Sequence, residues 1–221
     1  MFFSVIMPVF NAEKTLRRSL DALSRQTFRD FELIAVDDAS TDQSYSILCD
    51  YQKEARHPCI LEKNTVNLGV GATLQKAANL ASGDWMARLD SDDAYAHDYL
   101  ESRYMFILVN KGIYMMHGGK KVIGGSAYLV DASNPIKLIH YTETSQGPTL
   151  VIRRDFFHSI GGFSDKRYGE DFELLERVQR SHPHRIHKFN DGRYHYHRDN
   201  ENSLTHLALR ERNARIKASE R

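Results

Sequence analysis

The chain has 221 residues, of which 41% are hydrophobic and 27% charged, a composition typical of a folded globular protein. Its 30 Lys and Arg nearly cancel its 29 Asp and Glu, which argues against a protein whose main task is to coat a polyanion such as DNA. The longest apolar run is too short to span a bilayer, the first residues lack the basic stretch of a signal peptide, and the 2 cysteines are too few for a disulfide-built scaffold, so we expect a reducing, cytoplasmic compartment.

The first half of the chain alternates apolar runs of strand length with segments whose apolar residues recur at helical spacing. The apolar runs predict strands over Phe3–Met7, Phe31–Val36, Cys59–Leu61 and Trp85–Leu89. Helices are expected between them: one capped by Asn11 and extending to Leu23, one over Gln43–Glu54, and one between Gly71 and Ser82. This alternation predicts an α/β fold with a doubly wound, mostly parallel sheet, which binds ligands outside the carboxyl ends of its strands.

The second half is less regular. Apolar spacing predicts helices over Tyr99–Val109, Glu170–Arg180 and Leu204–Lys217, and short apolar runs mixed with glycine predict β structure over Gly112–Leu150. The last helix is basic. It is either a solvated helix or one that touches anionic lipid at a membrane surface, and the sequence leaves both alternatives open.

Four acidic or hydroxyl residues, Asp90–Asp93, follow the buried strand that ends at Leu89. In an extended backbone Asp90 and Asp92 point to the same side, where two carboxylates repel each other unless a cation lies between them. A hard divalent cation can fill that place and keep coordination sites for phosphate oxygens. An acidic surface loop is the alternative, but the position directly after an apolar strand favours the metal.

Two further acidic pairs and a group of histidines have structural and functional interpretations. Asp37–Asp38 either contact a base or ribose at the end of a strand or cap the next helix. Glu170–Asp171 open a helix, where the helix dipole favours a carboxylate and also keeps it ionised, as a general base requires. His195 and His197 are expected to share a face of a strand, and a zinc site there stays open, although no Cys accompanies them.

Taken together, the ordered segments resemble a family 2 glycosyltransferase with the GT-A fold, over roughly residues 3 to 205. Each segment alone is weak, and their order makes the set specific. The matching segments are Ser4–Glu13, Leu23–Phe28, Phe31–Asp42, Asn67–Gly69, Ala81–Trp85, Leu89–Asp93, Arg153–Arg154, Gly161–Phe163 and Gly169–Asp171.

The resemblance implies a nucleotide pocket in the first half. Pro8, Phe10 and Glu13 should line it, Asp38 should contact the base, most often uracil, and Asp90 should take part in donor binding. One position departs from the family pattern: Ala39 stands where glycine is usual. The turn therefore either avoids positive φ or bears a small strain.

The resemblance also implies a metal and a general base. Asp90 and Asp92 match the D-x-D pair, with Asp92 the direct ligand of Mn²⁺ or Mg²⁺ and Asp93 close by. His197 lies in a segment where some relatives place a further metal or phosphate contact. Asp171 matches the proposed general base.

The implied activity is inverting, metal-dependent transfer of a sugar from a nucleotide-sugar, most often a UDP-sugar, to a hydroxyl of a saccharide or lipid-linked saccharide, in cell-envelope polysaccharide or glycolipid assembly. The expected organisation is a single GT-A domain, with a nucleotide-binding half over about 1–98, an acceptor half over about 99–203 and the basic helix over 204–221. The expected location is cytoplasmic, including peripheral contact with the inner face of the membrane. A nucleotidyltransferase is the first alternative, although Pro8–Asn11 is not the basic, glycine-rich phosphate loop that it usually has. A catalytically inactive sugar-nucleotide binding module is the second.

Overall fold

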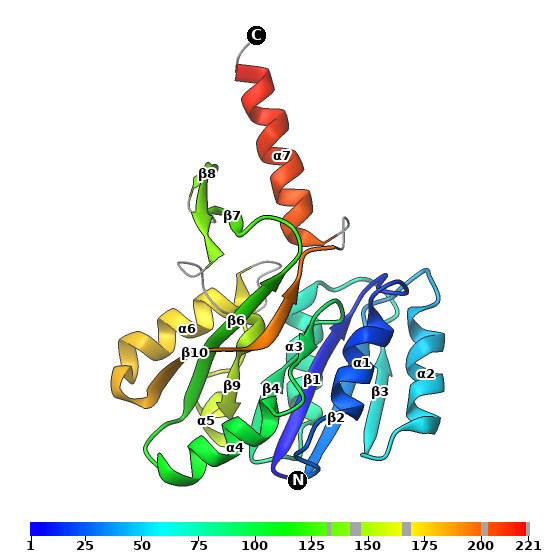
Figure 1. Ribbon diagram of the computed structural model, residues 1–221, viewed down its shortest axis with the longest axis vertical. Coiled ribbons are helices and arrows are strands. Elements are labelled where there is room, and N and C mark those ends of the chain that lie inside the picture. Colours follow the sequence, from blue (N-terminus) through cyan, green and yellow to red (C-terminus); the bar gives the residue numbers. More distant parts are fainter. Residues whose placement is uncertain (132–133, 142–146, 165–168, 200–202, 220–221) are drawn as a thin grey trace.

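The computed structural model describes residues 1–131, 134–141, 147–164, 169–199 and 203–219 (Figure 1). These residues form a central eight-stranded sheet in the order β3-β2-β1-β4-β9-β6-β10-β5. Its strands are β1 (Phe3–Val9), β2 (Phe31–Asp37), β3 (Cys59–Lys63), β4 (Trp85–Arg88), β5 (Ala94–Tyr95), β6 (Met115–Ile123), β9 (Val151–Arg153) and β10 (Ile186–His197).

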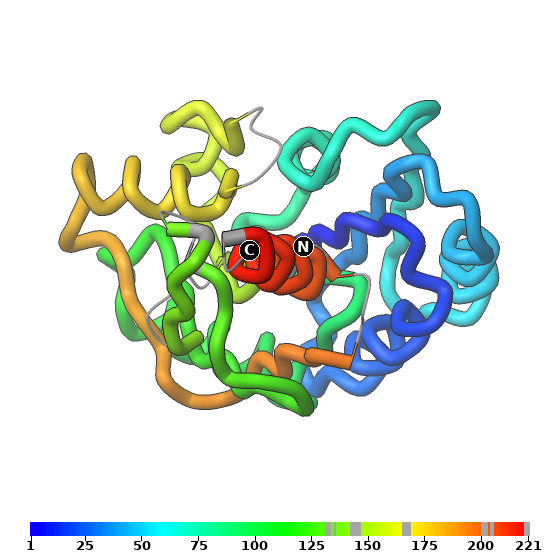
Figure 2. Tube along the Cα trace, turned by 90° about the horizontal axis from the view of Figure 1, so that it is seen from above, coloured from blue at the N-terminus to red at the C-terminus, as the bar shows by residue number. Residues whose placement is uncertain are grey.

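Strands β3, β2, β1 and β4 are parallel, and helices cover both faces of the sheet (Figures 1 and 2). On one face are α1 (Leu16–Ser24), α2 (Ser44–Glu54) and α4 (Tyr99–Val109), and on the other α3 (Val70–Leu80), α5 (Arg154–Ser159) and α6 (Glu170–Ser181). Successive residues of a strand alternate between the two cores: Val5 and Met7 pack on the α1 face, whereas Ile6 packs on the α3 face. The predicted doubly wound, mostly parallel sheet is confirmed.

The loop between β1 and α1 differs from the prediction. Helix α1 begins at Leu16, and Asn11 does not cap it. Asn11 has φ 47° and its Oδ1 accepts a hydrogen bond from the backbone N–H of Thr41 at 2.9 Å, because this loop packs on the loop that follows β2. In that second loop Ala39 has φ 60°, so the turn bears the strain of a left-handed alanine rather than avoiding it.

The second half extends the sheet with mixed strand directions. Strand β9 is antiparallel to both β4 and β6, and β6 is parallel to β10. The β structure expected over Gly112–Leu150 is present as β6 and as a separate hairpin of β7 (Tyr128–Asp131) and β8 (Asn134–His140). Strands β9 and β5, helix α5, most of β10 and the short helices η2 (Gly147–Thr149) and η3 (Pro183–Arg185) were not predicted, because none shows strong periodicity.

Helix α7 (Leu204–Ser219) rises from the middle of the molecule beside the β7-β8 hairpin (Figures 1 and 2). The Arg212 guanidinium Nε donates to the Ile136 carbonyl of β8 at 2.6 Å. Within the described part of the chain, no helix combines the length and the apolar character that crossing a membrane requires.

Candidate active site

The acidic turn after β4 is fixed on helix α1. Its closing hydrogen bond runs from the Asp93 N–H to the Asp90 carbonyl at 3.1 Å. Two hydroxyl groups of the loop and helix that follow β1 hold the turn from outside: Thr15 Oγ1 donates to the Ser91 carbonyl at 3.2 Å and Ser19 Oγ to the Asp93 carbonyl at 2.6 Å. The D-x-D segment is therefore held to the carboxyl end of β1, as expected for a parallel sheet with its site at that edge.

A buried arginine joins this turn to the start of α6. Arg88, the last residue of β4, is 6% exposed. Its Nε and Nη2 donate to the two oxygens of Asp90 at 2.7 and 3.2 Å, and its Nη1 donates to Glu170 Oε1 at 2.9 Å. Burial alone would lower the pKa of Arg88, but Asp90 and Glu170 outweigh burial and raise it well above its usual value. Two acidic segments 80 residues apart thus share one guanidinium.

Asp171 lies next to that ion pair and against the backbone of η2. Its Oδ1 accepts from the Phe172 N–H at 2.8 Å, in the first turn of α6. A Cβ on Gly147 would lie 1.5 Å from Asp171 Oδ2, so only glycine fits beneath this carboxylate. The charge of Asp171 also acts on Arg88 and on Lys120. The expected general base and the D-x-D turn therefore share one electrostatic environment.

Lys120 of β6 is a second buried cation, and its charge interacts with several of these acids. It is 8% exposed, and its ammonium lies 4.7 Å from the centre of the Tyr196 ring. Burial lowers its pKa to about 8, and Asp93, Asp171 and Asp90, in that order, oppose the shift.

Asp93 ties strand β10 to the acidic turn. It is fully buried, its Oδ2 accepts from the Tyr194 hydroxyl at 2.8 Å, and its Oδ1 accepts from the His197 backbone N–H at 2.8 Å. Burial, with Asp92 and Asp90 adding to it, raises the pKa of Asp93 well above its usual value. Both oxygens of Asp93 thus have protein partners, and His197 approaches the turn through its backbone. Their expected metal contacts stay predictions.

Asp38, at the end of β2, organises the start of α3. The carboxylate is 3% exposed and accepts three hydrogen bonds: from Asn64 Nδ2 at 2.9 Å and from the backbone N–H groups of Leu68 and Gly69 at 2.8 Å each. Its own N–H donates to the Val9 carbonyl at 2.7 Å. The predicted contact with a base stays a prediction, and the structure adds a role in holding the 64–69 loop.

The other residues expected in the nucleotide pocket lie at the carboxyl end of β1. Pro8 is partly buried within the strand. Phe10 directly follows the strand and is 49% exposed. Glu13 Oε2 accepts from the Gln43 N–H at 3.2 Å, so this side chain turns toward the start of α2. Pro8, Phe10, Glu13 and Asp38 thus gather at one edge of the sheet.

The donor set at the D-x-D turn suits a hard divalent cation in one respect. Asp90 and Asp92 are both partly exposed and offer carboxylate oxygens, although both oxygens of Asp90 already accept from Arg88. Across the described ranges no group of three or more His, Cys, Asp or Glu is arranged to hold a metal ion. Mg²⁺ is often bound by one or two carboxylates, with substrate phosphates and water completing its octahedron. Two aspartates beside a diphosphate fit that pattern.

The sequence profile of Glycosyl transferase family 2 matches residues 4–158, more than half of the chain. The chain belongs to this family. The resemblance inferred from the ordered motifs is confirmed. Among curated relatives, EpsE of Bacillus subtilis is 28% identical over 178 residues, which cover 78% of this chain and 64% of EpsE. The poly(ribitol-phosphate) beta-glucosyltransferase of Bacillus spizizenii is 35% identical over 113 residues, 50% of this chain and 18% of that protein.

Solved structures show the same GT-A fold. TarS 1–349 from S. aureus in complex with UDP-GlcNAc superposes with a TM-score of 0.77 at 23% identity, covering 94% of this chain and 61% of the TarS 1–349 chain. The mannosyltransferase PcManGT from Pyrobaculum calidifontis, in complex with GDP-Man and Mn²⁺, gives 0.72 at 21% identity and covers 99% and 64%. The chain thus spans less than two thirds of the length of these relatives.

Four residues around the acidic turn and the start of α6 escaped sequence reasoning: Arg88, Lys120, Tyr194 and Arg198. One signal for Arg88 was available, since a charged residue inside the otherwise apolar run Trp85–Leu89 must find a buried partner. The buried Arg198 donates through Nη1 to the carbonyls of Ser126 and Tyr128, and its charge acts on Lys120. For Lys120, Tyr194 and Arg198 the local sequence carries no comparable signal.

Proposed function

We propose that this chain is a metal-dependent, inverting glycosyltransferase that moves a sugar from a UDP-sugar to a hydroxyl acceptor in the assembly of a cell-envelope polysaccharide or glycolipid. One observation carries the proposal: Arg88 binds the D-x-D carboxylate of Asp90 and the α6 carboxylate of Glu170 at once. Donor-side and acceptor-side acids are thereby held at one site.

The comparisons support the donor class. TarS is described with UDP and with UDP-GlcNAc, and PcManGT with GDP-Man. The two ligands of TarS, UDP and UDP-GlcNAc, both contain uracil, the base that we propose Asp38 contacts. The curated relative of Bacillus spizizenii is named a glucosyltransferase acting on a ribitol-phosphate polymer, which supports an envelope acceptor.

In the proposed reaction Asp171 accepts the proton of the acceptor hydroxyl. The hydroxyl oxygen forms a bond to the anomeric carbon from the face opposite the diphosphate, and the bond from that carbon to the diphosphate oxygen breaks, with its electron pair leaving on the diphosphate. Configuration at the anomeric carbon is inverted. Arg88 keeps Asp90 and the start of α6 in place, and the contact with Gly147 fixes where Asp171 can lie. Asp92 and Asp90 would hold a divalent ion, which supplies positive charge beside the departing diphosphate.

The test is the release of nucleoside diphosphate from a panel of UDP-sugars and GDP-mannose, with and without Mn²⁺ or Mg²⁺. Asp171→Asn should lower turnover by about 10²–10⁴-fold while donor binding is kept. Asp92→Asn should abolish the metal-dependent part of donor binding in calorimetry. Asp50→Asn, an exposed aspartate on α2 that pairs with Lys53, is the matched control and should change neither.

Two other outcomes would overturn the proposal. Release of pyrophosphate would indicate a nucleotidyltransferase, and donor binding in calorimetry without release of any product would indicate an inactive binding module. Full activity of Asp171→Asn with an unchanged fold would remove this residue from the role of general base.

Contact between α7 and a membrane is a further part of this proposal. Its support is the basic character of the helix, which includes Arg210, Arg215 and Lys217. Sedimentation with anionic vesicles tests it: the chain should co-sediment, and replacing these three residues by Gln should abolish co-sedimentation. Equal sedimentation of both proteins would refute it.

A further inference from the structure

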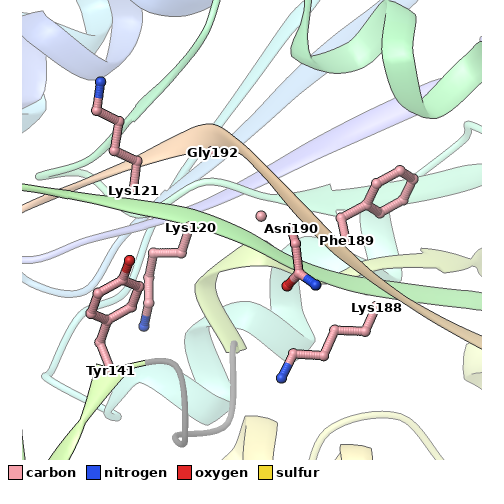
Figure 3. A pocket seen from close by; sticks show the side chains of 8 residues that line it. Lys120, Lys121, Tyr141, Lys188, Phe189, Asn190 and Gly192 are labelled. Atoms are coloured by element: carbon pink, nitrogen blue, oxygen red, sulfur yellow. The ribbon is translucent and has the colours of Figure 1, made fainter.

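A cavity of about 390 Å³ opens between β6 and β10 (Figure 3). It lies where the pairing of the two strands shifts register between Phe189 and Tyr194. Gly119 and Gly192 line it, with φ of 72° and 68°, conformations that other residues rarely adopt. A Cβ on Gly119 would lie 2.2 Å from Asp191 Oδ1, whereas one on Gly192 would meet only Lys121 Cβ, at 3.7 Å, so the missing side chain at Gly192 is the one that leaves space beside the strands.

The cavity has a positive lining. Lys120 and Lys188 flank it on the side where Tyr141 and Asn190 also lie (Figure 3), and Lys121 borders it. None of the described residues that line it carries a carboxylate. A cavity lined by ammonium groups and a side-chain amide is complementary to a negatively charged ligand.

The nearest carboxylate along β10 does not neutralise this lining. Asp191 lies between two cavity residues in the sequence, but its Oδ2 accepts from Arg103 Nη1 at 2.6 Å and from Arg193 Nη1 at 3.1 Å. Arg103 is itself buried, so this aspartate is held by guanidinium groups. Asp191 therefore does not pair with Lys188. Lys188 is exposed, and its positive charge faces the cavity and the solvent.

Lys120 connects the cavity to the reacting groups. Its ammonium interacts with the charges of Asp93, Asp171 and Asp90, and its side chain lines the cavity. The Tyr141 ring lies on the same side and offers an aromatic face of the kind on which sugar rings pack. A ligand that fills the cavity therefore extends toward the carboxylate that faces the acceptor hydroxyl.

We propose that this cavity binds a negatively charged group of the acceptor, a phosphate or a carboxylate, so that the acceptor is an anionic saccharide or polyol chain and not a neutral one. The identification of the bound group as part of the acceptor rests on the proposed function, whereas the anion site itself is argued from the cavity alone. Lys188 and Asn190 hold the outer part of the charged group, and Lys120 holds the part next to Asp171.

Three soluble probes distinguish the chemistry by calorimetry: a glycerol-phosphate oligomer, an oligogalacturonate and a neutral malto-oligosaccharide. We expect one or both anionic probes to bind and the neutral one to bind at least tenfold more weakly. The better anionic probe identifies phosphate or carboxylate as the preferred group. Lys188→Glu should weaken anion binding about tenfold, because it reverses an exposed charge at the cavity.

Lys111→Glu is the matched control, an exposed lysine in the turn before β6 and outside the cavity, and it should change affinity less than twofold. Equal binding of neutral and anionic probes, or equal losses in the two variants, would overturn the inference. Hydrolysis of a UDP-sugar in the absence of acceptor distinguishes failure of the anion site from failure of the proposed glycosyltransferase function. Lys188→Glu should hydrolyse donor like the unmodified chain, whereas absence of hydrolysis in the unmodified chain would count against the proposed function and leave the anion site standing.

Discussion

The two halves of the molecule bury opposite charges. In the described part of the first half, up to residue 98, the buried acids are Glu32, Asp37, Asp38 and Asp93, and Arg88 is the buried cation. In the described part of the second half the proportion is reversed, with Arg103, Lys120 and Arg198 buried beside Glu170. The acids of the first half are satisfied largely by N–H and O–H groups, as for Asp38.

Two cations of the second half, Arg103 and Lys120, contact aromatic rings and interact with carboxylates far away in the sequence. Arg103 lies 3.9 Å from the Phe189 ring centre and pairs with Asp191. At the boundary between the two halves, a buried cation of the first half pairs with a buried acid of the second, since Arg88 binds Glu170. The comparison teaches that the candidate site lies where the complementary charges of the two halves meet, which makes it sensitive to any change in one half alone.

Removing the boundary cation should have the largest effect. Arg88→Met leaves two carboxylates without their partner and should lower the free energy of unfolding by about 3–5 kcal/mol, measured by urea denaturation. Arg153→Met is the control, because Arg153 pairs with Asp155 at a more exposed position and should cost less than about 1 kcal/mol. The double variant Arg88→Met, Glu170→Met should regain part of the loss. If Arg88→Met costs no more than the control, the boundary pair does not hold the halves together.

Displacing Asp171 without removing it should have the next largest effect. Gly147→Ala places a methyl group where Asp171 Oδ2 lies and should lower the transfer rate about 100-fold, since a shift of about 1 Å costs that much. Gly112→Ala is the control, because its Cβ would meet only the flexible end of Arg185, at 3.1 Å. Near-normal turnover of Gly147→Ala with unchanged thermal stability would contradict the proposed position of the base.

The buried lysine predicts a pH dependence. The pKa of Lys120 is lowered from 10.5 to about 8, so between pH 8 and 10.5 the unfolded chain binds more protons at this residue than the folded one. Stability should therefore rise with pH across this window in the unmodified chain, relative to Lys120→Met. Chemical denaturation from pH 7 to 10.5 measures the difference. The exposed neighbour variant Lys121→Met should follow the unmodified chain, and parallel curves for Lys120→Met would refute the assignment.

The smallest effect concerns the first half alone. Ala39→Gly removes the strain of φ 60°, about 1–2 kcal/mol, and adds unfolded-chain entropy of about 0.5–1 kcal/mol. We expect a net gain of about 0.5 kcal/mol in the free energy of unfolding, read from the urea midpoint. A clear loss of stability would mean that this turn does not hold its alanine in the left-handed region.

The amino-acid sequence alone determined the elements whose signal is local. Continuous apolar runs predicted β1, β2 and β4, helical spacing predicted α4 with the observed bounds, and the order of short motifs led to family 2. These predictions succeed because strand and helix periods, and segments next to strand ends, are properties of neighbouring residues.

Only the tertiary structure decided how the charges are paired. Strand β10 alternates polar and apolar residues weakly. It pairs with β6 and β5, and there the Tyr194 hydroxyl and the His197 N–H donate to Asp93. The second partner of Arg88, Glu170, lies 82 residues away, and the cavity lies where two strands shift register. A buried charge must find its partner among all residues that folding brings near it, and that choice is not encoded in the residues on either side of it.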